Sequence, residues 1–524
     1  MIKIDKLYAN WGKTIMLALG ILALAFFLRL LNIKNGQTPI FGDEAIYIRW
    51  AQIMRADPTL RFVSLSDGKQ PLYMWALMPF LKVYSDPLFA GRLVSVFCGL
   101  GTILGVLLLT QYLFQAKKVT LIAGLIYTLS PFSLFFDSMA LVDAMLAMFG
   151  VWTVFLATAA IKTRRLDFAM LAGFALGGAL LTKSPGIYFA LLLPSVILLS
   201  LWPKNLSGKL LHLIKSISLL IPTYFIGFAM QNIMRLGPNF QMLNSRNADY
   251  IYPLSHIFQR PLDPLVPFVE KAINWLWLLG PGILILLIVA GIFINFKKFK
   301  KEILFLIIWA FVPIFISAEY GKVFTARYIF FSLPFIFIIA ASTLLSKKYK
   351  NFIKAFLVIF VVHAIYIDFL LLTNINAAPL PVGERSGYLE EWTAGTGIKE
   401  ASEYIINFHK SKQDEKIIVG TEGYFGTLPD GLEIYLNSYP EITVIGVGLN
   451  LTKLPDSLKS AKDAGDTVFL VINSSRLNTN PENIGLKLLA SYAKAFRKPG
   501  TREYNTLGPR ENLYLFEVED NNND

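Results

Sequence analysis

Long apolar runs constrain the fold of this chain more than any other feature. Segments of about 20 apolar residues recur, which is the length that a helix needs to cross the hydrocarbon core of a membrane. Only 16% of the 524 residues are charged, whereas a soluble globular chain carries about 25%. The sequence predicts a mainly α-helical, polytopic membrane protein with about eleven spans, at 14–33, 88–114, 119–137, 142–160, 167–183, 186–203, 211–234, 273–295, 302–318, 328–346 and 352–373.

The basic residues indicate how the chain is oriented. The net charge of +13 comes largely from lysines and arginines in short segments between the apolar runs, such as 297–301 and 347–354. With eleven crossings these segments all fall on one side, which is the positive-inside pattern. We therefore expect a multi-pass protein of the cell membrane with a cytoplasmic amino terminus. This distribution accounts for the charge without a nucleic-acid partner.

The carboxy-terminal part differs from the rest in composition. Residues 374–524 have ordinary polarity, with a helix-like stretch at 397–410 and another at 451–464. Short β-branched runs lie at 416–419, 442–447, 467–472 and 513–518. Strands that alternate with helices indicate a small α/β domain. We predict a transmembrane domain over 1–373 and an extracytoplasmic α/β domain over 374–524, whose acidic tail at 519–524 is expected to fray.

Two adjacent carboxylates, Asp43 and Glu44, follow the first apolar run and lie in the outer loop 34–87. After them Ile46, Trp50 and Met54 recur at helical spacing, which predicts an amphipathic helix at the membrane interface. Asp43 is then either the N-cap of this helix or a general base at the mouth of a membrane cavity. The two interpretations are compatible.

A second carboxylate and four cations are assigned to the same end of the bundle. Asp143 opens another apolar helix, so N-capping is again the simpler interpretation. A lone lysine or arginine at a helix end usually anchors the helix at the interface. However, Arg92 lies a few residues inside a span, where a charge costs about 2.5–3.5 kcal/mol at full depth. The four cations, which together suggest an anionic partner such as a phosphate, are Lys69, Arg92, Lys183 and Arg327.

This set of charges suits transfer from a lipid-linked donor. Cations can hold a lipid-linked phosphate as it leaves, and a carboxylate can deprotonate an acceptor hydroxyl that attacks a sugar carbon. The chain has no nucleotide-binding glycine loop. Its single cysteine and four scattered histidines suggest no metal site. No cofactor is expected with certainty, although Asp43 and Glu44 could help to bind a divalent cation together with a substrate phosphate.

Six short motifs resemble a known superfamily. They are Asp43-Glu44, Lys69-Gln70-Pro71-Leu72-Tyr73, Arg92-Leu93-Val94-Ser95, Ala140-Leu141-Val142-Asp143, Leu181-Thr182-Lys183-Ser184-Pro185 and Ala326-Arg327-Tyr328. Their order and topology resemble the protein O-mannosyltransferase and lipid A aminoarabinose transferase superfamily. These are glycosyltransferases of the GT-C class, family 39-like, that use polyprenyl-phosphate sugars. The resemblance covers roughly residues 10–345.

The resemblance implies an inverting transfer of a sugar, mannose or another hexose or pentose, from a polyprenyl-phosphate donor to a protein, lipid or glycan outside the cytoplasm. It implies that Asp43 is the catalytic carboxylate, that Glu44 supports it and that Asp143 is the second site carboxylate. The residues implied to surround the donor phosphate are Lys69, Arg92, Lys183 and Arg327, and those implied to line the substrate pocket are Tyr73 and Tyr328. The chain departs from the family in Gln70, where proline is commoner, and in Ser184, where glycine is frequent.

Two other classes of protein compete with this interpretation. A transporter or flippase of lipid-linked sugars predicts charges near mid-span and discontinuous helices in paired halves. A membrane-anchored receptor needs far fewer than eleven spans. Separately, the segment Glu390–Gly395 either approaches the membrane site or is a linker with a buried tryptophan, Trp392.

Overall fold

The computed structural model describes residues 4–200, 202–412 and 415–519. The chain forms two compact units. The first, here called the helical unit, comprises residues 1–35, 57–76 and 92–381. The second, the α/β unit, comprises 36–56, 77–91 and 382–524. Two segments that overlap the loop predicted at 34–87 thus group with the carboxy-terminal residues. The expected fraying tail beyond residue 519 lies outside the described residues.

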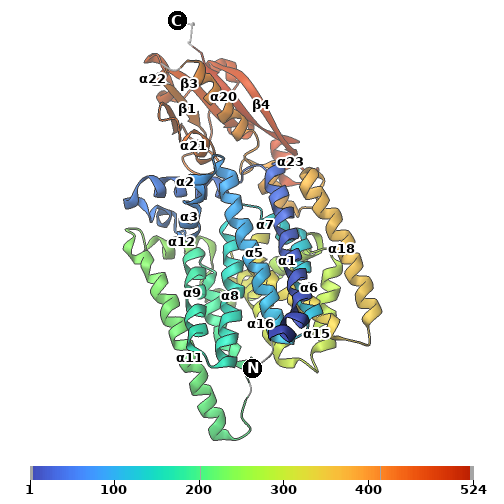
Figure 1. The fold of residues 1–524 in the computed structure, drawn as a ribbon. Coiled ribbons are helices and arrows are strands. Elements are labelled where there is room, and N and C mark those ends of the chain that lie inside the picture. Colours follow the sequence, from blue (N-terminus) through green and yellow to red (C-terminus); the bar gives the residue numbers. More distant parts are fainter. Residues whose placement is uncertain (1–3, 201, 413–414, 520–524) are drawn as a thin grey trace. The chain divides into compact units, whose positions relative to one another are not determined.

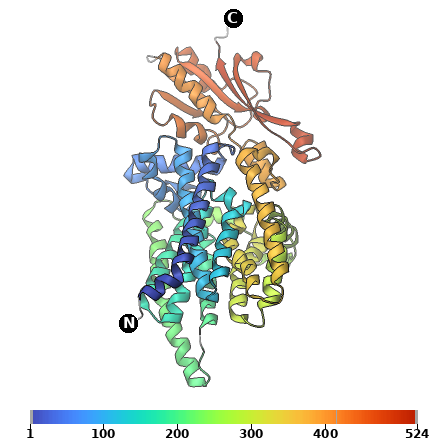
Figure 2. The same ribbon diagram turned by 45° about the vertical axis from the view of Figure 1, so that its right-hand side comes forward.

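Apolar helices build the helical unit, and its long helices run side by side in both views (Figures 1 and 2). Seven helices among the described residues are long and apolar enough to cross a membrane, and α14 and α15, bent by 108°, form an eighth candidate. The protein is therefore a multi-pass membrane protein. The helices are α1 (Ile4–Asn35), α3 (Leu72–Leu77), α5 (Pro87–Phe114), α6 (Lys117–Leu129), α7 (Pro131–Phe136), α8 (Val142–Thr163), α9 (Leu166–Thr182), α10 (Gly186–Leu192), α11 (Leu206–Asn232), α12 (Met242–Tyr250), α13 (His256–Gln259), α14 (Leu265–Leu278), α15 (Ile283–Asn295), α16 (Lys300–Tyr320), α17 (Leu333–Ser342) and α18 (Lys350–Thr373).

The expected count of eleven spans is not confirmed, because prolines interrupt several apolar runs. The run 119–137 is divided into α6 and α7 at Ser130, whose extended backbone is what a residue before proline prefers. The run 186–203 contains α10 followed by a 3₁₀ segment, Leu193–Leu199, with Pro194 in its first turn. Apolar length alone did not reveal these breaks.

A buried ion pair joins the first span to the short helix α7. In the side chain of Arg29, Nε and Nη2 each lie 2.9 Å from Oδ2 of Asp137, and both side chains are 0% exposed. Gly99 in α5 leaves the space for this carboxylate, since a Cβ there would lie 2.4 Å from the same oxygen. Two charges buried in a low-dielectric bundle are tolerated because each neutralises the other.

The α/β unit contains one five-stranded sheet of order β2-β1-β3-β5-β4. Its strands are β1 (Ile417–Thr421), β2 (Ile442–Gly446), β3 (Thr467–Asn473), β4 (Leu486–Phe496) and β5 (Arg510–Val518). The first three are parallel, whereas β5 is antiparallel to both β3 and β4. The four expected β-branched runs correspond to β1, β2, β3 and β5. The strand β4 was missed because its lysine, alanine and serine residues have low β-propensity.

Helices cover both faces of this sheet (Figure 1). On one face the rings of Tyr404 and Phe408 in α20 (Ile398–Ser411) pack edge-on against Phe469 of β3. On the other face Leu458 of α22 (Asp456–Asp463) joins a core with Ile418 and the residues that alternate with Phe469 along β3. This alternation along β3 is what a strand buried on both faces requires. The remaining helices of the unit are α2 (Gly42–Ala56), α4 (Phe80–Val83), α19 (Val382–Arg385), α21 (Asp430–Leu436) and α23 (Arg502–Leu507).

Candidate active site

Lys183 and Asp143 form an ion pair in the helical unit, with 2.6 Å between Nζ and Oδ1. Asp143 lies in the first turn of α8 and Lys183 follows the last residue of α9. The Asp143 carboxylate is buried, and its second oxygen, Oδ2, has no hydrogen-bond partner among the described residues. The Lys183 ammonium also lies 4.7 Å from the centre of the Tyr328 ring. The ammonium of Lys183 is therefore held between the Asp143 carboxylate and the face of the Tyr328 ring.

Two further predicted cations lie within electrostatic reach of Lys183. The charges of Arg327 and Lys69 both act on its ammonium, together with that of Asp143. Arg327 lies over the Tyr328 ring and Lys69 over the Tyr250 ring, at 5.7 Å and 4.9 Å from the ring centres. These three cations and the single carboxylate paired with Lys183 leave an excess of positive charge, which favours an anionic ligand such as a phosphate.

The turn that carries Lys69 is fixed by the short helix α12. Asp67 forms an ion pair of 2.6 Å with Arg246, and a Cβ on Gly68 would lie 2.6 Å from Cβ of Arg246. Gln70 donates from Nε2 to Oγ of Ser184 at 2.8 Å, and Ser184 donates in turn to Oδ1 of Asn247 at 3.0 Å. The two departures from the family pattern thus contact each other. Sequence reasoning missed α12, because its polar residues carry no apolar periodicity.

Tyr73 is connected through Ser95 to the segment that precedes Asp143. The Tyr73 hydroxyl lies 3.0 Å from Oγ of Ser95, which donates to the carbonyl of Leu141 at 3.3 Å. Tyr73 is fully buried, and so is nearly all of Arg92. Arg92 lies three residues before Ser95 on α5, hence on the same face of that helix. The hydrogen bonds of Ser95 fix α3 and α5 against the beginning of α8.

Neither predicted site aspartate is a helix N-cap. The helix α2 begins at Gly42 and α8 at Val142, so Asp43 and Asp143 are each the second helical residue. A capping side chain must belong to the residue that precedes the first turn. In α2 the adjacent Glu44 takes a related role, because its Oε2 accepts a hydrogen bond of 3.0 Å from the backbone N–H of Phe41. Asp43 and Glu44 belong to the α/β unit.

Comparisons with known proteins found one similar family and several similar structures. The family model described as dolichyl-phosphate-mannose-protein mannosyltransferase matches residues 68–226, which include Lys69, Arg92, Asp143 and Lys183. The crystal structure of ArnT from Cupriavidus metallidurans bound to undecaprenyl phosphate is similar to this chain, with a TM-score of 0.55, 15% identity and coverage of 98% of this chain and 99% of that one. The apo structure of the same protein gives a TM-score of 0.54, with 16% identity and coverage of 97% and 98%.

The chain has the same fold as ArnT, and its residues 68–226 match the mannosyltransferase family model. No curated protein matches it in sequence. The resemblance stated from six short motifs is thereby confirmed, as is the fold class of a helical membrane part with a small α/β part.

The helical unit also contains a buried acidic residue that sequence reasoning did not select. Glu319, at the end of α16, is 5% exposed, and neither of its carboxylate oxygens has a hydrogen-bond partner among the described residues. In sequence it is one of several polar residues of the segment 319–327, so nothing distinguished it. No group of three or more His, Cys, Asp or Glu side chains within 4–200, 202–412 and 415–519 is arranged to hold a metal ion.

The expectation of a buried tryptophan in the linker of this GT-C chain is wrong. Trp392 is 41% exposed, and the guanidinium of Arg476 lies over its ring at 5.3 Å. The neighbouring Glu391 is bound instead, by Arg497. The ion pair between Arg497 and Glu391 holds the segment 390–395 in place, so this segment does not depend on burial of the Trp392 ring.

Proposed function

We propose that this protein transfers a sugar from a polyprenyl-phosphate donor to an acceptor outside the cytoplasm, with inversion at the sugar carbon. The observation that carries the proposal is the cluster in which Lys183 pairs with Asp143 and lies within electrostatic reach of Lys69 and Arg327. The ArnT structure, which contains undecaprenyl phosphate, supports the donor class. Apolar helices around the cluster suit the long tail of such a lipid.

The proposed reaction is a single displacement. The acceptor oxygen forms a bond to the anomeric carbon while the bond from that carbon to the phosphate oxygen breaks. The acceptor proton passes to the Asp43 carboxylate, which acts as the general base. The electron pair of the broken bond remains on the polyprenyl phosphate. Glu44, which accepts the Phe41 N–H, helps to hold the beginning of α2 in place.

The cations of the cluster stabilise the leaving group. The donor phosphate is a diester that becomes a monoester and gains negative charge as the sugar departs, and ammonium and guanidinium groups that already face it require no reorganisation. In this proposal Lys183, Lys69 and Arg327 contact the phosphate, and Arg92 contributes from α5. Asp143 keeps the Lys183 side chain extended toward the phosphate and limits repulsion among the cations.

The decisive experiment compares the wild type with Asp43→Asn. Purified protein is supplied with radiolabelled polyprenyl-phosphate hexoses and pentoses and with a membrane extract as acceptor. Covalent transfer by the wild type, lost in Asp43→Asn, supports the proposal. Asp456→Asn is the matched control, because that carboxylate is 89% exposed in α22 and should leave transfer unchanged.

The same experiment separates the competing class of transporter. A flippase would move the labelled lipid between leaflets of a proteoliposome without forming a covalent product. Equal transfer by wild type and Asp43→Asn would remove Asp43 from the catalytic role. The panel of donors also identifies the sugar, for which the matched family suggests mannose as the first candidate.

A further inference from the structure

Arg497 directly follows β4, and all three of its guanidinium nitrogens donate hydrogen bonds. Its Nε and Nη2 donate to the two oxygens of Glu391 at 2.7 Å and 3.1 Å, and Nη2 also donates to Glu511 of β5. Its Nη1 donates to the carbonyls of Leu507 and Gly508. The guanidinium is fully buried. A bidentate, buried pair of this kind fixes Glu391 rigidly to the edge of the sheet.

The segment after Glu391 holds the beginning of α2. The Gly42 N–H donates to the carbonyl of Thr393 at 3.1 Å, and the Gly395 N–H donates to the carbonyl of Ile40 at 2.7 Å. Phe41 and Ala394 form an isolated antiparallel β-bridge between these bonds. The backbone that precedes Asp43 is therefore in register with the backbone that follows Glu391.

Close packing at Gly42 strengthens this register. Oγ1 of Thr427 donates to the same Thr393 carbonyl at 3.3 Å, and a Cβ on Gly42 would lie only 2.9 Å from that hydroxyl oxygen. Glycine thus lets the first turn of α2 approach the loop that follows β1. Asp43 is the next residue, so a shift of this contact moves its carboxylate directly.

The far half of α2 is bound to the same unit. Nε of Arg49 lies 2.7 Å from Oε2 of Glu433 in α21, and its Nη1 donates to Oδ1 of Asn437 at 2.8 Å. Gln52 donates to the carbonyl of Ile434 at 2.9 Å, and the Trp50 ring lies 5.7 Å from that of Phe425. Contacts at both ends leave α2 little freedom to tilt or to slide.

We propose that the α/β unit positions the general base of the transferase, with Arg497 and Arg49 as positioning residues that act on Asp43 through Glu391 and α2. This inference rests on the proposed function, since it needs Asp43 to be the base. A misplacement of about 1 Å at a reacting group can lower a rate by about 100-fold. In this proposal the α/β unit keeps kcat high because it holds Asp43 in the reacting position.

The test uses the full-length protein and two kinds of measurement. Hydrogen exchange of residues 38–56 reports on the order of α2, and transfer assays give kcat and the KM for the donor. The variants are Arg497→Lys, Arg49→Ala, Glu433→Ala and the charge swap Arg49→Glu with Glu433→Arg. Arg49 and Glu433 are about three quarters buried, whereas Arg497 is fully buried. Substitution of Arg49 or Glu433 should therefore destabilise the protein less than removal of Arg497.

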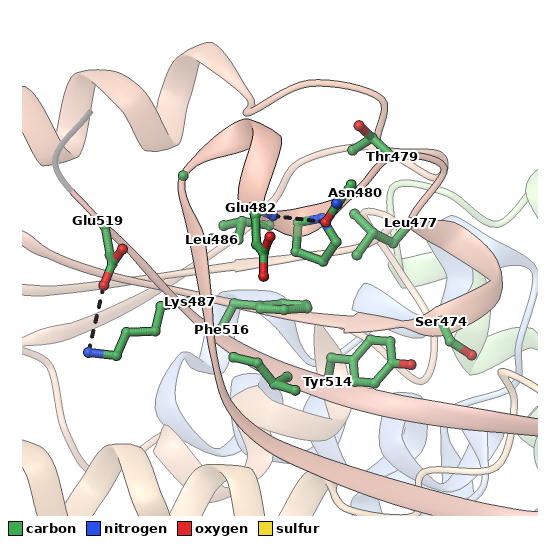
Figure 3. A pocket seen from close by; sticks show the side chains of 13 residues that line it. Ser474, Leu477, Thr479, Asn480, Glu482, Leu486, Lys487, Tyr514, Phe516 and Glu519 are labelled. Atoms are coloured by element: carbon green, nitrogen blue, oxygen red, sulfur yellow. Dashed lines mark hydrogen bonds and ion pairs between the residues drawn. The ribbon is translucent and has the colours of Figure 1, made fainter. Parts of the chain in front are cut away.

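A matched control comes from an ion pair that lies away from α2. Lys487 of β4 and Glu519 pair at 3.6 Å on the rim of an open groove of about 720 Å³, which Tyr514 and Phe516 line (Figure 3). Both residues of the pair are more than half exposed. Lys487→Ala removes an ion pair from the same sheet without touching the segment 391–395 and should change neither measurement.

We expect Arg497→Lys and Arg49→Ala to lower kcat by about tenfold or more, with little change in the KM for the donor, and to speed exchange in residues 42–56. The charge swap should restore most of kcat. Faster exchange with unchanged kcat, or a swap that restores exchange but not kcat, would overturn the inference. If Asp43→Asn also retains full activity, the proposed function fails instead, so the two failures are distinguishable.

Discussion

The ammonium of Lys183 lies 2.6 Å from one oxygen of Asp143, while the other oxygen of that carboxylate has no hydrogen-bond partner in the described part of the chain. A buried carboxylate ordinarily has both oxygens bound. The open oxygen can accept a hydrogen bond from a hydroxyl group of a ligand, whereas an anionic phosphate would face the cations near Lys183.

The first prediction concerns this pair. Lys183→Met should raise the KM for the donor by at least about tenfold, because a charge-assisted contact to phosphate is worth about 1.5–3 kcal/mol. Asp143→Asn should keep the shape of the site but release Lys183, and should therefore lower kcat more than it changes KM. Initial rates over a range of donor concentrations separate the two effects. Lys209→Met, in α11 and away from the cluster, is the control, and an unchanged KM in Lys183→Met contradicts the assignment.

The second prediction concerns the contact between Gln70 and Ser184. Ser184→Gly should lower activity because it leaves the Gln70 amide and Asn247 without a shared partner, at a cost of about 1 kcal/mol. Gln70→Pro alone should leave Ser184 with one partner and also lower activity. The double variant has the commoner family residues at both positions. Its loss of kcat/KM, expressed as a free energy, should be smaller than the sum of the losses in the two single variants. A double-mutant cycle of kcat/KM measures this coupling, and strictly additive effects would contradict it.

The third prediction is a pH effect at Lys494 in β4, outside the membrane. Burial lowers the pKa of this lysine to about 8, although Glu511, Glu422 and Glu391 oppose the shift. Between pH 8 and the ordinary lysine pKa of about 10.4, the unfolded state binds more protons than the folded state, so the free energy of unfolding rises with pH. The rise should reach about 3 kcal/mol for the α/β unit.

The measurement for Lys494 is a comparison of thermal unfolding at pH 7 and pH 10. The wild type should gain Tm relative to Lys494→Met, which carries no titrating group at this position. Lys487→Met is the control, since Lys487 is exposed on the same strand and should follow the wild type. A constant difference between wild type and Lys494→Met at the two pH values would show that Lys494 does not titrate in this range.

Much of the site could be predicted from the sequence because charges are rare in apolar runs. Lys69, Lys183, Arg327 and Asp143 were selected because they are assigned to the same end of the bundle, and in the structure Lys183 pairs with Asp143 within electrostatic reach of Lys69 and Arg327. The partners of the turn, Arg246 and Asn247, could not be selected. Polar residues are ordinary in a loop, and only the tertiary contact with Gly68 and Ser184 distinguishes them.

For the fold, too, the elements that depend on local sequence could be predicted, whereas those that depend on tertiary contacts could not. Apolar length predicted the helical membrane part, and β-branched runs predicted four of the five strands. The grouping of α2 with the carboxy-terminal sheet could not be predicted, since it depends on single contacts such as Arg49 with Glu433, almost 400 residues apart in sequence. Local sequence signals do not indicate which distant residues form such a pair.

The last prediction concerns the ion pair of Arg29 and Asp137 inside the helical unit. Arg29→Met should destabilise the protein by about 3 kcal/mol or more, because it leaves the buried Asp137 carboxylate without its counter-charge. The double variant Arg29→Met with Asp137→Leu should recover much of this loss, since an apolar pair needs no desolvation of charge. Gly99→Ala should act in the same direction as Arg29→Met, because its methyl group would displace the carboxylate. Thermal unfolding in detergent measures all three, with Gly383→Ala as the control, because a Cβ at Gly383 meets no atom within 4 Å. If the double variant is as unstable as Arg29→Met, the pair stabilises the bundle by a contact other than mutual neutralisation.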